Sequence, residues 1–224
     1  MTYNEILSEL ERLKDPVNIE GMKRFGITPK HTFGVRLPDL RRIAKESGRD
    51  HELALKLWSK DTRETRILAS MIAEPKKTSS ELMDAWASEF TYWEICDQCC
   101  MNLFWLTPIA YEKACEWSSR DEEYVKRAGF ALMTVLAWKD KLVLDEKLEA
   151  FFPYIKESSI DERPIVKKAV NWALRQIGKR DRALNSKAIK LTREIELIDS
   201  KAAKWIAKDA VRELEGDAVR KRLA

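Results

Sequence analysis

A tryptophan set among basic residues is the feature of this sequence most suited to binding chemistry. The segment 165–180, IVKKAVNWALRQIGKR, carries five cationic side chains and no acidic one. On a helix, Lys168, Trp172, Arg175 and Lys179 fall within an arc of roughly 60°. The opposite, apolar face is formed by Val166, Val170, Ala173, Leu174 and Ile177. An aromatic ring between cations suits a ligand with anionic groups and flat apolar faces, such as nucleic acid. The alternative is that Trp172 packs under a neighbouring helix and the stems of the basic side chains cover it.

A carboxylate in an apolar segment is the second candidate. Asp97 lies in the middle of 91–106, TYWEICDQCCMNLFWL, which is apolar almost all the way round a helix. Trp93 precedes it by one turn, so the indole ring can cover the carboxylate. Burying a carboxylate is costly unless the group has a partner or a task. Asp97 is therefore either a reactive acid or a structural bridge to a neighbouring helix.

An arginine in 123–138, EYVKRAGFALMTVLAW, supplies a possible partner. The core side of this helix is formed by Val125, Ala128, Gly129, Leu132 and Leu136. Arg127 faces the other way, beside Ala131 and Thr134, and such small neighbours leave room for a phosphate at the guanidinium. An ion pair between helices would look the same in the sequence. Together, Trp93, Asp97, Arg127 and Trp172 describe a cleft with one acid, one cation and two aromatic walls.

Helical periodicity runs through nearly the whole chain, and alternating β-branched runs are lacking, so we predict an all-α fold. Proline and capping residues indicate the breaks: Pro38, Pro75, Pro108 and Pro164 near helix ends, and Ser79, Asp121 and Ser200 as N-caps. The predicted helices span 3–14, 38–47, 51–60, 62–74, 79–90, 91–106, 108–118, 122–138, 143–157, 162–179, 183–195 and 199–214.

A basic residue recurs early in several of these helices. Arg66, Arg127, Lys168 and Lys204 are separated by 61, 41 and 36 residues, and a unit centred on Asp97 fits the first gap. Helix pairs repeating every 30–40 residues or so are typical of HEAT-like repeats. We therefore predict an α-α superhelix, a solenoid with a concave basic cleft. The chain lacks a Gly/Ser-rich linker, which indicates one domain, 1–224.

The charge is distributed unevenly, although the whole chain carries only +4. Residues 162–224 contain 17 basic and 9 acidic side chains, a net +8, which leaves −4 for residues 1–161. We expect an anionic partner to approach the C-terminal third first.

The cysteines and the hydropathy exclude some classes of protein. Cys96 and Cys99 form a C-x-x-C pair, but it lies within a helical apolar pattern, far from His31 and His51, so we expect buried free thiols rather than a metal site. Neither a hydrophobic signal core nor an apolar run of 18 residues is present. We expect a cytoplasmic protein with no membrane contact.

Four motifs give the chain a resemblance to a known family. They are Gly34-Val35-Arg36-x-Pro38-x-Leu40-Arg41, the W-x-x-x-D of Trp93–Asp97, the K-R-A of Lys126–Ala128 and the N-W-A-L-R of Asn171–Arg175. This set resembles the HEAT-repeat DNA alkylation-repair glycosylases over nearly the whole chain. The resemblance implies that Asp97 is the catalytic aspartate, that Trp93 and Trp172 line the cleft, and that Arg127 contacts phosphate. The N-terminal part departs from longer members, because only a short TPKHTF connection leads to the GVR motif.

The resemblance implies a monofunctional glycosylase that excises N3- or N7-alkylated purines from duplex DNA. It requires no cofactor, and we expect a monomer that is nucleoid-associated when bound to DNA. The expected backbone contacts are Lys126, Lys168, Arg175, Lys179, Lys204 and Lys208. Two alternatives stay open: a non-catalytic binder of damaged or branched DNA, and an α-solenoid scaffold for protein partners.

Overall fold

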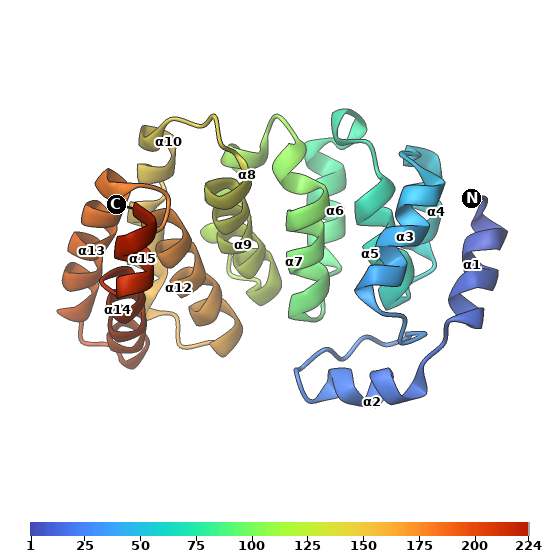
Figure 1. The fold of residues 1–224 in the computed structure, drawn as a ribbon, viewed down its shortest axis with the longest axis horizontal. Coiled ribbons are helices and arrows are strands. Elements are labelled where there is room, and N and C mark those ends of the chain that lie inside the picture. The colour runs from blue at the N-terminus through green and yellow to red at the C-terminus, as the bar shows by residue number, and fades with distance from the viewer. Residues whose placement is uncertain (224) are drawn as a thin grey trace. The chain divides into compact units, whose positions relative to one another are not determined.

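The computed structural model describes residues 1–223, and within this range every regular element is a helix, without a β-strand (Figure 1). The all-α prediction is therefore confirmed. The chain packs as two compact units, Met1–Pro108 and Ile109–Ala224. This division concerns packing, and the single domain stays a prediction.

The first unit holds seven α-helices and two 3-10 turns. They are α1 (Tyr3–Arg12), α2 (Pro16–Lys23), α3 (Leu37–Ser47), α4 (His51–Ser59), α5 (Arg63–Ile72), η1 (Pro75–Lys77), α6 (Ser80–Ser88), α7 (Trp93–Asn102) and η2 (Phe104–Leu106). α5 packs against α3, α4 and α7. Its position between three helices explains why nearly every residue of α5 is buried.

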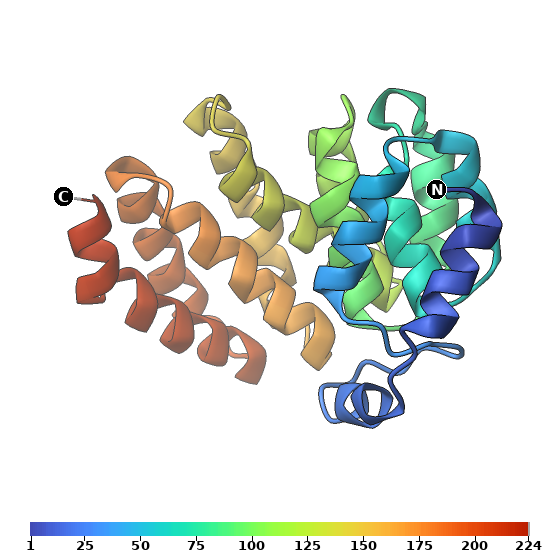
Figure 2. The same ribbon diagram turned by 45° about the vertical axis from the view of Figure 1, so that its right-hand side comes forward.

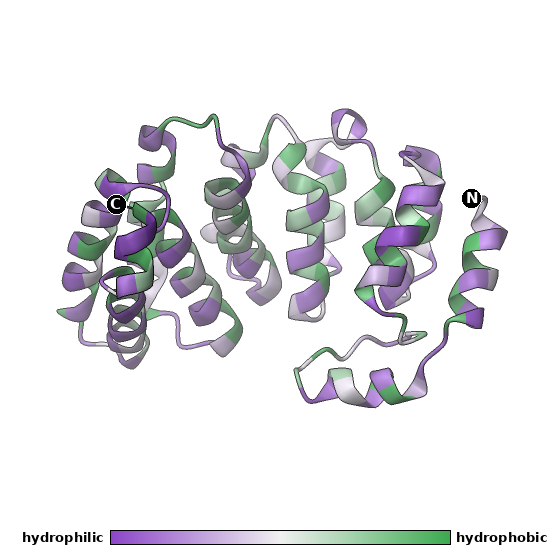
Figure 3. Ribbon diagram, in the orientation of Figure 1, coloured by the Kyte–Doolittle hydropathy of each residue, from purple (hydrophilic) through white to green (hydrophobic). Residues whose placement is uncertain are grey.

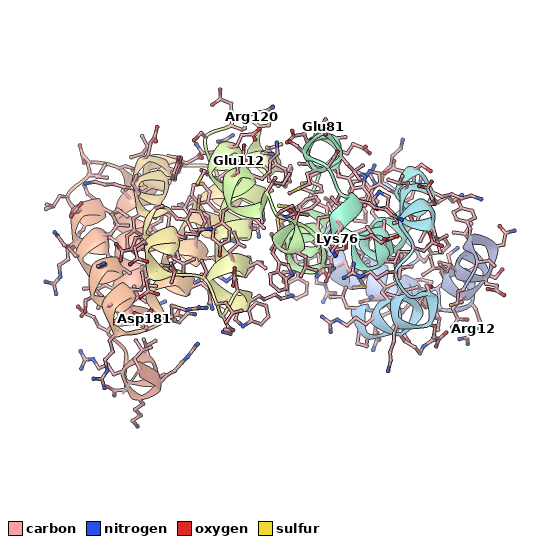
Figure 4. All side chains as sticks on the ribbon, turned by 90° about the horizontal axis from the view of Figure 1, so that it is seen from above. Arg12, Lys76, Glu81, Glu112, Arg120 and Asp181 are labelled. Carbon is pink, nitrogen blue, oxygen red and sulfur yellow. The ribbon has the colours of Figure 1, made fainter. Side chains whose placement is uncertain are left out.

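Aromatic rings fill part of the core of this unit. The rings of Trp58 and Trp86 stack in parallel with their centroids 4.0 Å apart, and Phe90 meets Trp58 edge-on. Stacked and edge-to-face pairs of this kind add stability beyond the apolar area that they bury. Polar side chains such as Arg12, Lys76 and Glu81 lie at the surface of the unit (Figure 4).

The second unit holds eight α-helices and one 3-10 turn. They are α8 (Ala110–Ser118), α9 (Glu123–Lys139), α10 (Asp145–Glu149), α11 (Phe152–Glu157), η3 (Ser158–Ile160), α12 (Pro164–Gly178), α13 (Arg182–Glu196), α14 (Lys201–Leu214) and α15 (Asp217–Leu223). α12, α13 and α14 lie side by side, as Figure 2 shows from a second direction.

α9 lies between α8 and α12, and this position buries it on both sides. Every residue from Arg127 to Ala137 is buried. Gly129 permits the close approach of α8, because a Cβ there would lie 2.4 Å from the backbone nitrogen of Ser118. Gly129 therefore allows α9 to pack closely on α8. This role agrees with the position predicted for Gly129 on the core side of the helix.

Most predicted helix starts are confirmed. Ser79 and Ser200 accept hydrogen bonds from the N–H groups of Leu82 and Ala203, as N-caps do. The Asp121 cap is wrong, because Glu122 precedes α9 and makes no side-chain cap bond. The single helix predicted over 143–157 is two helices, since Pro153 in the first turn of α11 cannot continue α10.

The recurring basic positions do fall early in successive helices. Arg66 lies on α5, Arg127 on α9, Lys168 on α12 and Lys204 on α14, each within five residues of the helix start. Their surroundings differ, because Arg66 and Arg127 are buried while the two lysines are exposed. Figure 3 shows that hydrophilic and hydrophobic residues alternate around most helices, as helices packed on one side require.

Candidate nucleic-acid interface

Asp97 is buried on α7, with 5% of its surface exposed. It shares the helix with two further buried polar residues, Glu94 and Gln98. α7 packs on α5, so the carboxylate is held on a helix that is itself fixed by the core. The predicted burial of Asp97 is confirmed.

Trp93, one turn earlier, is half-buried and fixed by a hydrogen bond. Its indole N–H donates to the carbonyl oxygen of Phe25 at 2.8 Å. Phe25 belongs to the turn after α2, and the neighbouring Gly26 adopts a φ of +71°. The ring is thus positioned by the turn after α2, a helix that the sequence did not predict. Covering of the Asp97 carboxylate by this ring stays a prediction.

A buried ion network, which the sequence reasoning missed, orients α7. Arg63 on α5 donates from Nε and Nη2 to both carboxylate oxygens of Glu94, each at 2.7 Å. It also donates from Nη1 to the carbonyl oxygen of Val35 at 2.8 Å and to Glu64 at 3.1 Å. A bidentate pair fixes both distance and angle between two helices. Glu94 precedes Asp97 by three residues, so this network sets where Asp97 lies.

The GVR motif of the sequence also serves this network. Glu64 is fully buried and accepts the N–H groups of Phe33, Gly34 and Val35 at 2.9 to 3.2 Å. Gly34 has a φ of +78°, and a Cβ there would lie 2.3 Å from the carbonyl oxygen of Asp15. The motif therefore fastens the segment before α3 to α5. The sequence alone did not reveal this role, because Arg63 and Glu64 begin the helix together with Thr65 and Arg66, where polar residues are ordinary.

In the second unit, Arg127 is buried rather than open to solvent. Its Nη1 donates to the carbonyl oxygen of Ile165, in the first turn of α12, at 2.9 Å. The predicted small neighbours, Ala131 and Thr134, are themselves fully buried because α9 is covered from both sides. The expectation that they leave open space must be corrected. A further role of Arg127 toward phosphate stays a prediction.

Lys126 forms a cluster with two residues before α12. It pairs with Asp161 at 3.5 Å, and Arg163 binds both oxygens of the same carboxylate at 2.9 and 2.6 Å. Burial raises the pKa of Asp161, but the hydrogen bonds from Arg163 outweigh it, and the pKa is lowered overall. Two cations share one anion here, so the cluster keeps a net positive charge.

The predicted stripe on α12 is only partly available for a ligand. Its apolar face is confirmed, because Val166, Val170, Ala173, Leu174 and Ile177 are all fully buried. Trp172 is half-buried and Lys168 is exposed. Arg175 and Lys179, however, both pair with Glu213 of α14, Lys179 at 2.6 Å. Arg175 also lies 3.6 Å from Asp209, so carboxylates of α14 already pair with both cations, and their contacts to phosphate stay a prediction.

α14 adds exposed cations and a second aromatic ring. Lys204 pairs with Asp199 at 2.9 Å, whereas the exposed Lys208 makes no ion pair within residues 1–223. Trp205 is half-exposed, and the Nζ of Lys167 lies 5.3 Å from its ring centroid. Basic and aromatic side chains therefore alternate from α12 to α14, as in surfaces that bind nucleic acid. The cleft of Trp93, Asp97, Arg127 and Trp172 draws on both units and stays a prediction.

The thiols are placed as the sequence indicated. Cys96, Cys99 and Cys100 are buried thiols, and Cys115 is a half-buried one. Burial raises the pKa of Cys99 well above its usual value, so this thiol is not a ready nucleophile. Across residues 1–223, acidic, histidine and cysteine side chains nowhere gather in threes that could hold a metal ion. Nor does that range contain a helix of the length and hydropathy needed to cross a membrane.

Comparison with known proteins gives one family and one fold. A solved structure described as "a new family of proteins related to the HEAT-like repeat DNA glycosylases with affinity for branched DNA structures" aligns with a TM-score of 0.80 and 22% identity. The alignment covers 100% of this chain and 96% of that one, and it confirms the HEAT-like repeat fold. No curated protein matches. The model of the DNA alkylation repair enzyme family matches residues 6–214. Since that match spans nearly the whole chain, the protein belongs to the DNA alkylation repair enzyme family.

Proposed function

We propose that this family member is a monofunctional DNA glycosylase that excises N3- or N7-alkylated purines from duplex DNA. Alkylation at these nitrogens gives the base a positive charge and weakens its glycosidic bond. The protein then has to stabilise an oxocarbenium-like sugar and direct a water molecule, which one carboxylate can do. The observation that carries the proposal is the buried Asp97, fixed on a helix that the Arg63–Glu94 pair orients.

Each of the other candidate residues has a supporting role in this proposal. Trp93 and Trp172 pack on the deoxyribose and favour its developing positive charge through their ring faces. Arg127 binds a phosphate next to the damaged nucleotide. A low-dielectric surrounding strengthens the attraction between Asp97 and a cationic sugar, because little water screens it. The first unit thus supplies the acid, and the second supplies cations.

The phosphate contacts fall into two groups. Lys168 and Lys208 are exposed and meet the DNA backbone directly. Lys126, Arg175, Lys179 and Lys204 carry carboxylate partners, and a phosphate has to share or displace those partners. Exchange of one anion for another keeps the cation satisfied throughout binding. The proposal therefore gives Lys168 and Lys208 the larger part of the electrostatic attraction.

A second candidate function is non-catalytic binding of branched DNA. The solved structure of the same fold is described as having affinity for branched DNA structures, and it aligns over the full length of this chain. In that case the basic surface of α12 and α14 keeps its role, and Asp97 serves as a structural bridge. The two candidates differ in one observable, the release of a base.

The test replaces Asp97 by Asn, which keeps the shape of the side chain and removes its charge. Excision of 7-methylguanine from a labelled duplex, scored as abasic sites, should fall by on the order of a hundredfold, while DNA affinity changes little. Glu112→Gln makes the same chemical change at an exposed position of α8 and should leave excision unchanged. Trp172→Ala should weaken both binding and excision.

Two results would decide against the glycosylase. Normal excision by a folded Asp97→Asn protein would show that Asp97 is not the catalytic carboxylate. A wild-type protein that binds branched DNA more tightly than linear duplex, and releases no base from either, favours the binder.

A further inference from the structure

A small basic pocket lies at the far end of α9 and α12 in the second unit. It has a volume of about 230 Å³. Its walls include Trp138, Lys141, Lys179, Arg180 and Arg222, and no acidic residue lines it. Four cations around one small cavity repel each other unless an anion is close. The pocket therefore has the charge of an anion site.

Two of the four cations already have partners. Arg180 donates from Nη1 to the carbonyl oxygens of Asp140 at 2.7 Å and Ala137 at 3.3 Å, and so caps the end of α9. Lys179 pairs with Glu213. Lys141 and Arg222 are exposed and make no ion pair within residues 1–223. These two side chains remain for a ligand.

Asp140 directly precedes Lys141 in the sequence, but its carboxylate accepts hydrogen bonds from other groups. Its Oδ2 accepts the Tyr111 hydroxyl at 3.0 Å, and its Oδ1 accepts the backbone N–H groups of Leu142 and Val143 at 3.2 and 3.1 Å. The carboxylate thus closes the turn after α9 and does not neutralise Lys141. Glu213 thus compensates Lys179, and within residues 1–223 Lys141 and Arg222 keep their positive charge.

Trp138 at the edge of the pocket adds a flat apolar surface. It is 46% exposed, although the residues before it on α9 are buried. The Nζ of Lys139 lies 5.5 Å from the ring centroid, which keeps a cation at the ring as well. A large aromatic ring next to the pocket that Lys141 and Arg222 line offers stacking and charge together, the combination that binds nucleotides.

We propose that this pocket binds a nucleotide of an unpaired DNA strand, with its phosphate between Lys141 and Arg222 and its base stacked on Trp138. A duplex offers phosphates but covers its base faces by stacking, so only an unpaired nucleotide uses both features. The volume suits a phosphate group, and the base lies outside on the exposed ring. The inference rests on the proposed DNA binding, but not on base excision. It adds single-stranded flaps or tails to the duplex as substrate features.

The experiment compares two probes by fluorescence anisotropy: a blunt duplex and the same duplex with a ten-nucleotide thymidine tail. Wild-type protein should bind the tailed probe roughly tenfold more tightly, as expected for stacking of one base. Trp138→Ala should abolish that preference and leave blunt-duplex affinity unchanged, whereas Trp138→Phe should retain most of it. The double variant Lys141→Glu with Arg222→Glu should weaken tail binding. Lys190→Glu, at an exposed position of α13, should leave it unchanged.

Equal affinity of the wild type for both probes would overturn the inference. So would an equal loss on both probes for Trp138→Ala with an unchanged circular dichroism spectrum. A failure of the glycosylase proposal can be told apart from a failure of this inference. If the protein releases no base but still prefers the tailed probe, the proposed role of this pocket stands.

Discussion

The two units each contain a network of charged residues that connects helices, and the two networks differ in how exposed their side chains are. In the first unit, the side chains of Arg63, Glu64 and Glu94 are at most 6% exposed and join α5 to α7. In the second, the side chains of Arg175, Lys179 and Glu213 are 20–31% exposed and join α12 to α14. Both arrangements connect helices of successive repeats through an Arg–Glu pair. They differ in how much water reaches the pair.

That difference separates positioning from binding. Removing one partner of a buried ion pair is costly, because the remaining charge is then buried without a partner and without water to solvate it. A partly exposed pair contributes less to stability and can exchange its partner. We therefore assign the first network to holding Asp97 in place, and the second to a surface where phosphates compete with Glu213.

The largest expected effect comes from breaking the buried pair. Glu94→Ala leaves the Arg63 side chain with Glu64 and the Val35 carbonyl as its partners within residues 1–223, so the free energy of unfolding should fall by about 3 kcal/mol. Urea denaturation followed by circular dichroism measures this change. Glu194→Ala removes an exposed partner of Lys156 and should have little effect. Similar stability of both variants would break the comparison.

The next effect has the opposite direction on function. Glu213→Gln removes the carboxylate that Arg175 and Lys179 share, so Lys179 becomes available for a phosphate, while Arg175 keeps Asp209 at 3.6 Å as its remaining partner. Duplex affinity at low salt should rise by roughly threefold to tenfold. Stability should fall only slightly, because water reaches the pair. Anisotropy titration with a blunt duplex provides the measurement, and a lower affinity would mean that the ion pair itself shapes the binding surface.

The sequence predicted elements and faces better than it predicted partners. The buried side of α12 followed directly from the spacing of Val166, Val170 and Leu174, since a helix has a fixed period. The Arg175–Glu213 pair did not follow, because it joins residues 38 positions apart on helices whose packing no local pattern specifies. The buried Arg63–Glu94 pair has the same character. Contacts between repeats require the repeat geometry.

The N-terminal part was missed for a different reason. α2 is only eight residues long and contains Gly21, so its periodicity is weak. Its start signal was nevertheless present: Asp15 accepts the N–H of Asn18, and Pro16 opens the helix. Trp93 could be assigned to a helix from the sequence, but its hydrogen bond to Phe25 could not. The helix α15 was also not predicted, because it is short and follows Gly216.

A smaller effect concerns the salt dependence of binding. Lys168→Glu removes one exposed phosphate contact, so the slope of log affinity against log salt should become shallower by about 0.9, with some further loss from repulsion. Lys190→Glu on α13 changes the net charge equally and should leave the slope unchanged. Titrations at four or more salt concentrations distinguish them. An equal change in both variants would mean that net charge, and not the α12 surface, determines DNA binding.

The smallest expected effect is a pH dependence confined to the exposed network. Burial raises the pKa of Glu213, but Lys179 and Arg175 lower it more, so the folded pKa lies below the usual 4.5. A depressed carboxyl pKa gives stability that is present above pH 4.5 and is lost as the pH falls through the folded value. Because the group is partly exposed, its share should stay below about 1 kcal/mol. Urea midpoints of wild type and Glu213→Gln should therefore differ at pH 7 and converge as the pH falls through the folded pKa of Glu213. A difference that stays constant over this range would show that Glu213 acts through packing, and the contrast between the two units would then not be one of exchangeable charge.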